Sequence, residues 1–221
     1  MKRFAAYCLA LSAILIFSST ASASSLTLNC SVVSGPTDLA AAAILCPQFN
    51  LIDPLSEISI AVSGGISGSI TLTNGDDAPH GTNSGTTTTT FNFGALSGFS
   101  FVNPIFDASY STGIRALSAG QTLTVSGLTN SDVGSLGSNT TLFGDYTGAG
   151  NFTIPVSTDT LFSAAGGGGF FMAAQASNAN ATAVVTYTYG PAGPAVPEPA
   201  TVTLLGLGLI GIGCKVRKFR R

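Results

Sequence analysis

The stretch Ile66-Ser-Gly-Ser-Ile-Thr-Leu-Thr-Asn-Gly75 decides the fold class. Its isoleucines and Leu72 alternate with polar residues, and Gly68 keeps the register, which is the period-two pattern of a strand with one buried face. The Asn74-Gly75 pair that follows is the strongest short signal for a hairpin turn. The stretch therefore predicts a β-strand that turns tightly into an antiparallel neighbour.

The same alternation recurs on both sides of this stretch, between turns rich in Gly, Asn, Ser and Thr. Because β-branched and aromatic residues suit half-buried pleated surfaces, we expect an all-β domain. Asp38–Leu45 is the one segment that could form a helical turn or two. The sequence predicts an antiparallel β-sandwich of about nine to eleven short strands, with a shallow barrel as the alternative. Further strands are predicted around 26–32, 58–62, 86–93, 121–125, 152–154, 170–175 and 181–189.

Charge is distributed very unevenly along the chain. Residues 24–195 contain no Lys and a single Arg, Arg115, against nine Asp and Glu residues, which gives a formal net charge of −8. The whole-chain value of −2 hides this, because seven of the eight basic residues lie near the two ends. An acidic domain without Lys is not expected to bind nucleic acid, whose affinity for proteins depends on cations.

The N-terminal segment has the three parts of a secretory signal peptide. Lys2 and Arg3 form the positive region, Phe4–Phe17 is apolar, and Ala21-Ser22-Ala23 is a small-residue cleavage site. We expect signal peptidase to remove residues 1–23, so that the mature chain starts near Ser24. The protein is then exported, and the domain matures outside the cytoplasm.

Two of the four cysteines, Cys30 and Cys46, lie in the exported domain. In an oxidising compartment two cysteines indicate one disulfide. Closing a loop of about fifteen residues would stabilise the fold by roughly 3 kcal/mol in the chain-entropy model. The alternative is a pair of buried free thiols.

Candidate chemistry in the domain is sparse. The lone histidine, His80, follows Asp76 and Asp77 in a Pro/Gly-containing loop that we expect to be solvated, and no Gly-x-Ser-x-Gly elbow accompanies it. The two aspartates are weak candidates for binding Ca²⁺, because Asp and Asn are also turn formers and no D-x-D-x-D-G loop is present. We predict no catalytic residue, no cofactor and no metal, so the protein is not expected to be an enzyme.

A literal G-x-G-x-x-G occurs at Gly206–Gly211, but it does not predict a dinucleotide site. That fingerprint needs a complete βαβ unit and an acidic residue about twenty positions later. Only ten residues follow Gly211, and none is acidic. The glycines belong instead to an apolar segment.

The C-terminal region has a linker, a motif, an apolar run and a basic end. Residues 190–195 form a Gly/Pro linker, and Ala200–Cys214 is uncharged and mostly apolar. Fifteen helical residues reach roughly 22 Å, which makes the predicted transmembrane helix at about 200–214 a marginal span of a bilayer core roughly 30 Å thick. The basic end at 215–221 is expected to lie on the cytoplasmic side, so that the domain lies outside. Its cations are Lys215, Arg217, Lys218, Arg220 and Arg221.

Val196-Pro-Glu-Pro-Ala-Thr201, followed by a Gly/Leu helix and a basic end, resembles the PEP-CTERM sorting signal. The resemblance covers about the last 26 residues and implies processing by an exosortase, with Pro197, Glu198 and Pro199 as the recognition motif. It also implies association with exopolysaccharide production. The domain upstream resembles the choice-of-anchor E domain through Phe49-Asn50 and residues 66–73, 121–127 and 184–189, which implies a surface or secreted module.

These observations predict a bacterial exported protein with a signal peptide at 1–23, a β-sandwich ectodomain at 24–189, a linker at 190–195 and a sorting tail at 196–221. A signal helix and a transmembrane helix would flank the sandwich. The expected role is structural or adhesive, in the cell envelope or in a biofilm matrix that contains polysaccharide. The expected location is an inner-membrane-anchored intermediate, then the cell surface or medium. The alternatives are a secreted carbohydrate- or calcium-binding module and, third, a secreted hydrolase.

Overall fold

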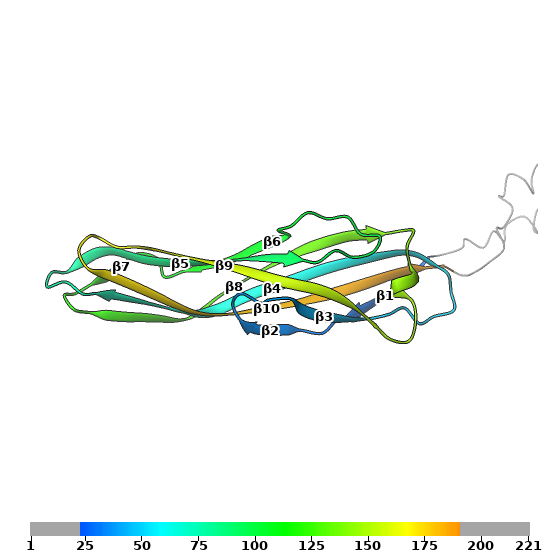
Figure 1. The fold of residues 1–221 in the computed structure, drawn as a ribbon, viewed down its shortest axis with the longest axis horizontal. Coiled ribbons are helices and arrows are strands. Elements are labelled where there is room, and N and C mark those ends of the chain that lie inside the picture. Colours follow the sequence, from blue (N-terminus) through cyan, green and yellow to red (C-terminus); the bar gives the residue numbers. More distant parts are fainter. Residues whose placement is uncertain (1–22, 191–221) are drawn as a thin grey trace, which may run out of the picture. The chain divides into compact units, whose positions relative to one another are not determined.

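A computed structural model describes residues 23–190 and arranges Ser24–Tyr189 in two antiparallel sheets packed face to face (Figure 1). The predicted all-β sandwich is confirmed. The predicted helices at the two ends of the chain lie outside the described residues. The strands are β1 (Ser24–Asn29), β2 (Val33–Pro36), β3 (Ala42–Pro47), β4 (Leu55–Asn74), β5 (His80–Phe93), β6 (Phe106–Ser111), β7 (Arg115–Leu117), β8 (Thr122–Asn139), β9 (Asn151–Ala165) and β10 (Phe171–Tyr189), and the short 3₁₀ helix η1 spans Gly144–Tyr146.

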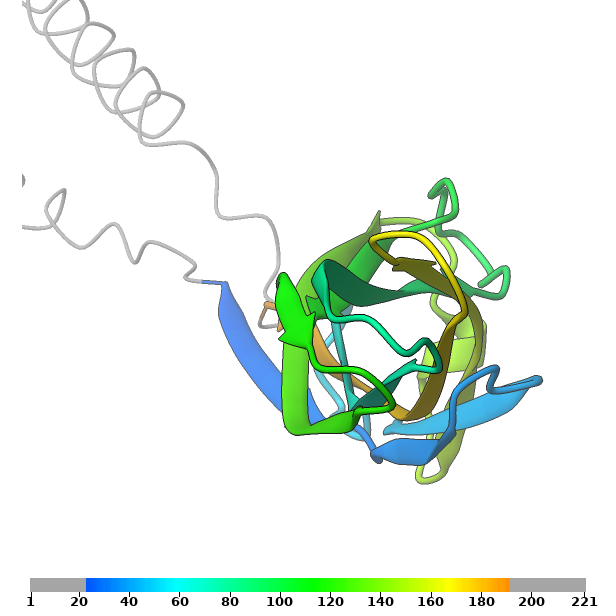
Figure 2. The same cartoon turned by 90° about the vertical axis from the view of Figure 1, so that its left-hand side faces the viewer.

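Each sheet contains five strands. The first has the order β1-β10-β4-β8, with β2 paired to β10 beyond the end of β1, and the second has the order β3-β9-β5-β6, with β7 paired to β5. Viewed from one end, the strands lie around a common axis (Figure 2). On one side β6 and β8 approach each other, and the side-chain amide of Asn130 donates a hydrogen bond to the carbonyl oxygen of Ser109 at 2.5 Å.

Five of the described strands, β4, β5, β8, β9 and β10, are much longer than the short ones that we predicted. The predicted runs 58–62 and 66–72 belong to the single 20-residue strand β4, and the runs 170–175 and 181–189 merge into the 19-residue β10. The glycines that separate the first two runs do not make a turn. A Cβ at Gly64 would lie 2.6 Å from the Phe91 ring, so glycine is needed there because the opposite sheet packs closely.

The predicted hairpin at Asn74-Gly75 is wrong. β4 pairs with β8 and β10, whereas β5 pairs with β6, β7 and β9, so the chain crosses between the sheets after Asn74. The backbone groups that a tight hairpin would use are occupied within the first sheet. The N–H of Asn74 donates to the carbonyl of Gln121 at 2.9 Å, and that of Gly75 donates to the carbonyl of Phe170 at 2.8 Å.

The helical turn considered for Asp38–Leu45 is also wrong. Asp38 and Ala41 have positive φ angles of 72° and 52°, which a right-handed helix excludes. The chain then enters β3, which pairs with residues 151–156 of β9. Contacts with β9 fix this conformation, because the N–H of Leu39 donates to the Thr158 hydroxyl at 2.9 Å.

Alternate residues of the central strands form the core between the sheets. Phe91 stacks on Phe106 with ring centroids 4.8 Å apart, and Phe93 and Phe106 are in a tilted contact at 6.1 Å. The Thr-rich run 86–93 is a strand as predicted, but it is a central strand whose Thr87 and Thr89 are buried. The other fully buried large side chains are Tyr146, Tyr187, Ile44, Ile58, Ile60, Ile66, Ile70, Leu72, Leu117 and Leu136.

Substitution of Gly68 by alanine tests how closely β4 and β10 approach each other. A Cβ there would lie 2.2 Å from the backbone oxygen of Ala176 and 2.5 Å from the Tyr110 hydroxyl, so Gly68→Ala must displace the backbone. We expect a loss of about 1–3 kcal/mol in the free energy of unfolding. Gly81→Ala is the control, because nothing lies within 4 Å of its added Cβ. Urea unfolding of both variants measures the difference, and equal stabilities would contradict the packing described here.

Candidate functional site

The candidate residues Asp76, Asp77 and His80 lie at one end of the sandwich, where three connections meet. We call this end the tip and define it by residues 74–80, 118–121 and 166–170. The side-chain amide of Asn74, which is fully buried, donates to the carbonyl oxygens of Ala78 at 2.8 Å and Ser118 at 3.0 Å. One buried asparagine therefore joins the β4–β5 connection to the segment that precedes β8.

Asp76 joins the third connection to the other two. Its Oδ2 lies 2.8 Å from Nε2 of His80 and accepts a hydrogen bond from the backbone N–H of Phe170 at 2.7 Å. The N–H of Phe170, followed by the hydrogen bond and charge of His80, lowers the pKa of Asp76 below its ordinary value of 3.8. Gly169, with φ at +71°, permits this approach, because a Cβ there would overlap Asp76 Oδ2.

The expectation that His80 lies in a solvated loop is wrong. Only 15% of its side chain is exposed, and the residue begins β5. Within residues 23–190 its ring makes a hydrogen bond to Asp76 alone, whereas a nucleophile would have to contact the ring in a Ser-His-Asp arrangement. The geometry is therefore that of a structural contact between connecting segments. We call the hydrogen bonds of Asp76 to His80 and Phe170 the Asp76 clasp.

The two calcium candidates do not converge on one point. Asp77 is exposed, while Asp76 Oδ2 is engaged by His80 and Phe170. No group of three or more His, Cys, Asp or Glu side chains that could hold a metal ion occurs in the described part of the chain. The tip thus offers a hydrogen-bonded carboxylate and no gathered set of acidic ligands.

The pH dependence of Asp76→Asn tests the clasp. Because the folded state depresses the pKa of Asp76, its contribution to stability is present above the ordinary carboxyl pKa and is lost as the pH falls through the folded-state value. We expect Asp76→Asn to melt at a lower temperature than the parent protein at pH 7. The difference should disappear in acid, and a difference independent of pH would contradict the clasp.

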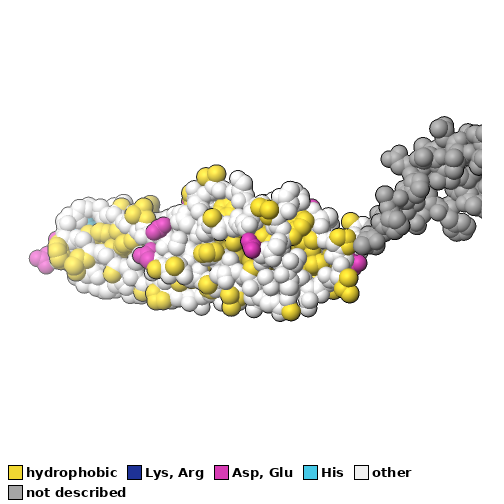
Figure 3. Space-filling model, turned by 45° about the vertical axis from the view of Figure 1, so that its right-hand side comes forward, with side chains coloured by type: hydrophobic (Ala, Val, Ile, Leu, Met, Phe, Trp, Pro, Cys, Tyr) yellow, Lys and Arg dark blue, Asp and Glu magenta, His cyan; other side chains and the backbone are white. Residues whose placement is uncertain are grey.

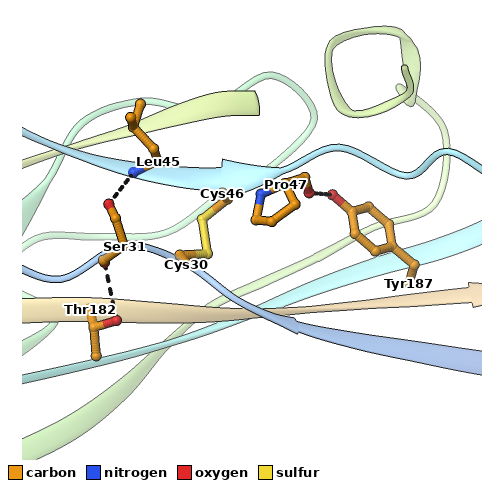
Figure 4. The surroundings of a disulfide bond; sticks show 7 residues. All are labelled: Cys30, Ser31, Leu45, Cys46, Pro47, Thr182 and Tyr187. Carbon is orange, nitrogen blue, oxygen red and sulfur yellow. Dashed lines mark hydrogen bonds between the residues drawn. A yellow bond between two sulfur atoms is a disulfide. The ribbon is translucent and has the colours of Figure 1, made fainter. Parts of the chain in front are cut away.

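The predicted disulfide between Cys30 and Cys46 is confirmed. It links the segment after β1 to β3, and therefore joins the edges of the two sheets, with a Cα–Cα distance of 4.3 Å (Figure 4). Ser31 and Leu45 exchange hydrogen bonds beside it, both at 2.8 Å. The Tyr187 hydroxyl donates to the carbonyl oxygen of Pro47 at 2.7 Å. This group of contacts holds the two sheets together on one side.

A hollow of about 390 Å³ lies where the loop before β6 meets β8. Phe101, Pro104, Ile105 and Leu136 line it with apolar surface, and the side chains of Ser100 and Ser135 add hydroxyl groups. Val102 on its rim is 86% exposed. With no titratable side chain in its lining, the hollow offers surface for a contact rather than groups for acid–base chemistry.

Ser24 pairs with Tyr189, so the first and last strands of the domain start and finish at the same end of the sandwich. Phe171, at the start of β10, pairs with Asn74 at the tip. At about 3.3 Å per residue, β10 places the tip roughly 60 Å from Tyr189. The acidic side chains visible in Figure 3 are scattered over the surface rather than gathered in one patch.

The remaining predicted site residues lie outside the described range. These are the cleavage-site residue Ala21, the motif Pro197-Glu198-Pro199, and the basic end at 215–221. Among residues 23–190 no helix has the length and apolar character needed to cross a membrane.

Comparison with solved structures gives weak likenesses. One is "Structure of infectious bursal disease virus Gt strain", with 13% identity, 77% of this chain and 38% of that chain covered, and a TM-score of 0.17. Another is "Bacillus endospore appendages form a novel family of disulfide-linked pili", with 11% identity, 79% and 93% coverage, and a TM-score of 0.14. This chain spans about 38% of the length of the first, and neither score supports a functional argument. No curated protein matches the chain.

Comparison with family models gives a specific result at the C-terminus. The model described as "PEP-CTERM protein-sorting motif" matches residues 195–218. The match includes Pro197, Glu198 and Pro199, the apolar run and the start of the basic end. The choice-of-anchor E resemblance of the upstream domain stays a prediction. The chain therefore carries a PEP-CTERM protein-sorting motif, which identifies an exported protein whose sorting depends on an exosortase.

Proposed function

We propose that this protein is a non-enzymatic structural or adhesive component of the cell envelope or biofilm matrix, delivered there by exosortase processing. The observation that carries the proposal is the sorting motif at residues 195–218, on a chain whose N-terminal residues predict a signal peptide. The motif accounts for export and sorting. The role after sorting is inferred from the physical character of the sandwich.

Two features of the domain support a role outside the cell. The Cys30–Cys46 disulfide suits an oxidising compartment. A row of hydroxyl groups lies on the outer face of the first sheet, where Thr71 contacts Thr124 at 3.0 Å and Thr73 contacts Thr122 at 3.1 Å. Such uncharged hydroxyl surfaces suit hydrogen bonding to polysaccharide, the partner that we propose.

The residue types of the tail support the proposed order of processing, in which the domain is first held at the membrane and then released. Pro197 and Pro199 fix φ and lack N–H groups, which favours an extended segment between the domain and the membrane. The apolar residues 200–214 would hold this segment at the membrane, and the cations of the basic end would stay on the cytoplasmic side. After signal peptidase removes residues 1–23, cleavage near the motif would release an acidic domain without the five terminal cations.

Complementation of a deletion strain tests the structural role against an enzymatic one. Deleting the gene is expected to weaken the matrix, measured as polysaccharide and protein retained in the matrix pellet. Wild-type protein and His80→Ala should restore it equally, because the proposal requires no titration of the lone histidine. Failure of an exported, folded His80→Ala protein to restore the matrix would contradict the proposal in favour of an activity at the tip.

A further inference from the structure

The connection between β5 and β6 is long for two strands that pair with each other. β5 ends at Phe93 and β6 begins at Phe106, so twelve residues join antiparallel neighbours that are usually joined by about two to five. Residues 100–105 of this connection and residues 135–137 of β8 line the hollow of about 390 Å³. Long connections carried by a rigid sheet are where binding residues are most often found.

Hydrogen bonds and packing fix this connection against the sandwich. The side-chain amide of Asn103 donates to the carbonyl oxygen of Phe93 at 2.7 Å, and its Oδ1 accepts from the N–H of Phe93 at 2.9 Å. The N–H of Ile105 donates to the carbonyl oxygen of Phe91 at 3.1 Å. Ile105 also packs against β8, because a Cβ at Gly134 would lie 2.3 Å from its Cγ2. A hollow with walls fixed in this way loses little conformational entropy when a ligand enters.

The lining of the hollow combines apolar surface with hydroxyl groups. Phe101 contributes an aromatic ring, and Ser100 is exposed, with a hydroxyl that makes no hydrogen bond to any residue between 23 and 190. The hydroxyl of Ser135 donates to the carbonyl oxygen of Ile60 at 3.3 Å and accepts from the N–H of Gly137 at 3.0 Å, which leaves it one position to accept a further bond. A pyranose ring matches this mixture, since its C–H bonds form an apolar face and its hydroxyls project around the edge.

The charge of the domain selects among carbohydrates. Residues 24–195 have a formal net charge of −8, and their single cation, Arg115, belongs to β7, which pairs with the start of β5 rather than with residues 94–105. The acidic residues nearest to the lining along the chain are Asp107 and Asp132. A polysaccharide of uronic acids would be repelled by this charge and would find no cation to pair with. An uncharged sugar meets neither obstacle.

An apolar side chain of another protein would match the apolar part of this lining but not its hydroxyl groups. It would cover Ser100 and Ser135 without supplying a partner, and a buried polar group without a partner costs binding free energy. A sugar supplies both donors and acceptors. Ser138, which follows Gly137, pairs with Ser59 across β8 and β4, so the hydroxyl surface continues beside the hollow. The neighbouring sugars of a polysaccharide chain would lie there.

We propose that this hollow binds one uncharged sugar residue of a polysaccharide chain, with the Phe101 ring against its C–H face and the Ser100 hydroxyl at its edge. We call residues 100–102, 104, 105 and 135–137 the sugar site. The inference rests on the proposed function, because it assigns a binding site to the polysaccharide partner named there. The proposed function does not require the sugar site, since the hydroxyl row around Thr71 and Thr124 is a separate surface nearer the tip.

A nuclear magnetic resonance titration of the isotope-labelled domain locates the binding. Residues 24–190 suffice, because every strand pairing, the disulfide and the core lie within this range. The probes are oligosaccharides from the host's matrix polysaccharide, separated by anion exchange into neutral and acidic fractions. The neutral fraction should shift the amide resonances of the sugar site, and the acidic fraction should not.

The other outcomes separate this inference from the proposed function. Shifts confined to the row around Thr71 and Thr124, or caused by the acidic fraction alone, would overturn the sugar site and leave polysaccharide as the partner. Shifts that vanish after protease treatment of the probe would identify a protein segment as the occupant and also overturn the site. No shift with either fraction would overturn both the site and the polysaccharide partner.

Substitutions test the two contacts of the sugar site. Phe101→Ala should weaken binding of the neutral oligosaccharides about tenfold, and Ser100→Ala about fivefold, the usual effect of one hydrogen bond. Because Phe101 packs partly against the core, the exposed Ser100 provides the variant whose fold is preserved. Phe170→Ala is the matched control, since this phenylalanine is 58% exposed at the tip, and it should bind as the wild type does. Wild-type affinity in Ser100→Ala, or an equal loss in Phe170→Ala, would overturn the proposal.

Discussion

Replacing Cys30 and Cys46 together with serine is expected to lower the free energy of unfolding by about 3 kcal/mol, the chain-entropy value for a loop of this length. For a domain of this size the loss corresponds to a fall in Tm of roughly 6–12 °C. The disulfide closes a sequence separation of 16 residues and joins β3, in one sheet, to the segment after β1, in the other. Its loss removes the covalent link between the sheets on that side.

The reductant provides the matched control for this prediction. Reducing the wild-type domain should lower its Tm by a similar amount, whereas the same reductant should leave the Cys30→Ser/Cys46→Ser variant unchanged. Scanning calorimetry of residues 24–190 with and without dithiothreitol makes both measurements. An unchanged Tm in the double variant would contradict the prediction, and would mean that the hydrogen bonds of Ser31, Leu45 and Tyr187 suffice to hold the two sheets together on this side.

Phe91→Ala is expected to have the largest effect of any single substitution considered, about 3–5 kcal/mol. The side chain is fully buried, stacks on Phe106 and packs over the backbone of Gly64. Removing the ring leaves a cavity at the centre of the sandwich. The glycine beneath it has no side chain that could move in, so the cavity cannot be filled locally.

Leu161→Ala serves as the comparison for the cavity. This leucine is 71% exposed in β9, and the substitution should change the free energy of unfolding by no more than about 0.5 kcal/mol. Guanidinium unfolding of both variants gives the two values. A Phe91→Ala domain as stable as Leu161→Ala would mean that the two sheets do not pack at this position.

The sequence predicted the type of fold but not the length or connection of its strands. Alternation at Ile66, Ile70 and Leu72 correctly indicates a strand with a buried face. The glycines were harder to interpret. A glycine such as Gly64 gives the same local signal whether it lies in a turn or packs under an aromatic ring from another sheet, and the Asn74-Gly75 pair predicted a hairpin where the chain crosses between the sheets. Only the position of Phe91, 27 residues further along the chain, distinguishes the two cases.

The contacts at the candidate site could be predicted from the sequence only where a residue had few possible partners. With two cysteines in the exported domain, one pairing was possible, and it formed. The Asp76 clasp depends on the N–H of Phe170, 94 residues away, and no local pattern indicates that partner.

The sorting motif is independent of the fold, since it is recognised from the order of residues in the tail. The structure of the sandwich adds to this where the motif joins the domain and how far the tip lies from that point. β10 finishes at Tyr189, directly before the linker and motif, while the tip lies roughly 60 Å away along the same strand. A domain held through residues beyond Tyr189 would leave its tip accessible.

The intact mass of the protein in membrane and medium fractions of its native host tests the central claim most directly. The account predicts a mature species that has lost residues 1–23 and everything beyond the Pro197-Glu198-Pro199 region. In a host without its exosortase, the account predicts a membrane-bound species that still ends at Arg221. A species that ends at Arg221 and stays in the membrane of a host with active exosortase would contradict it.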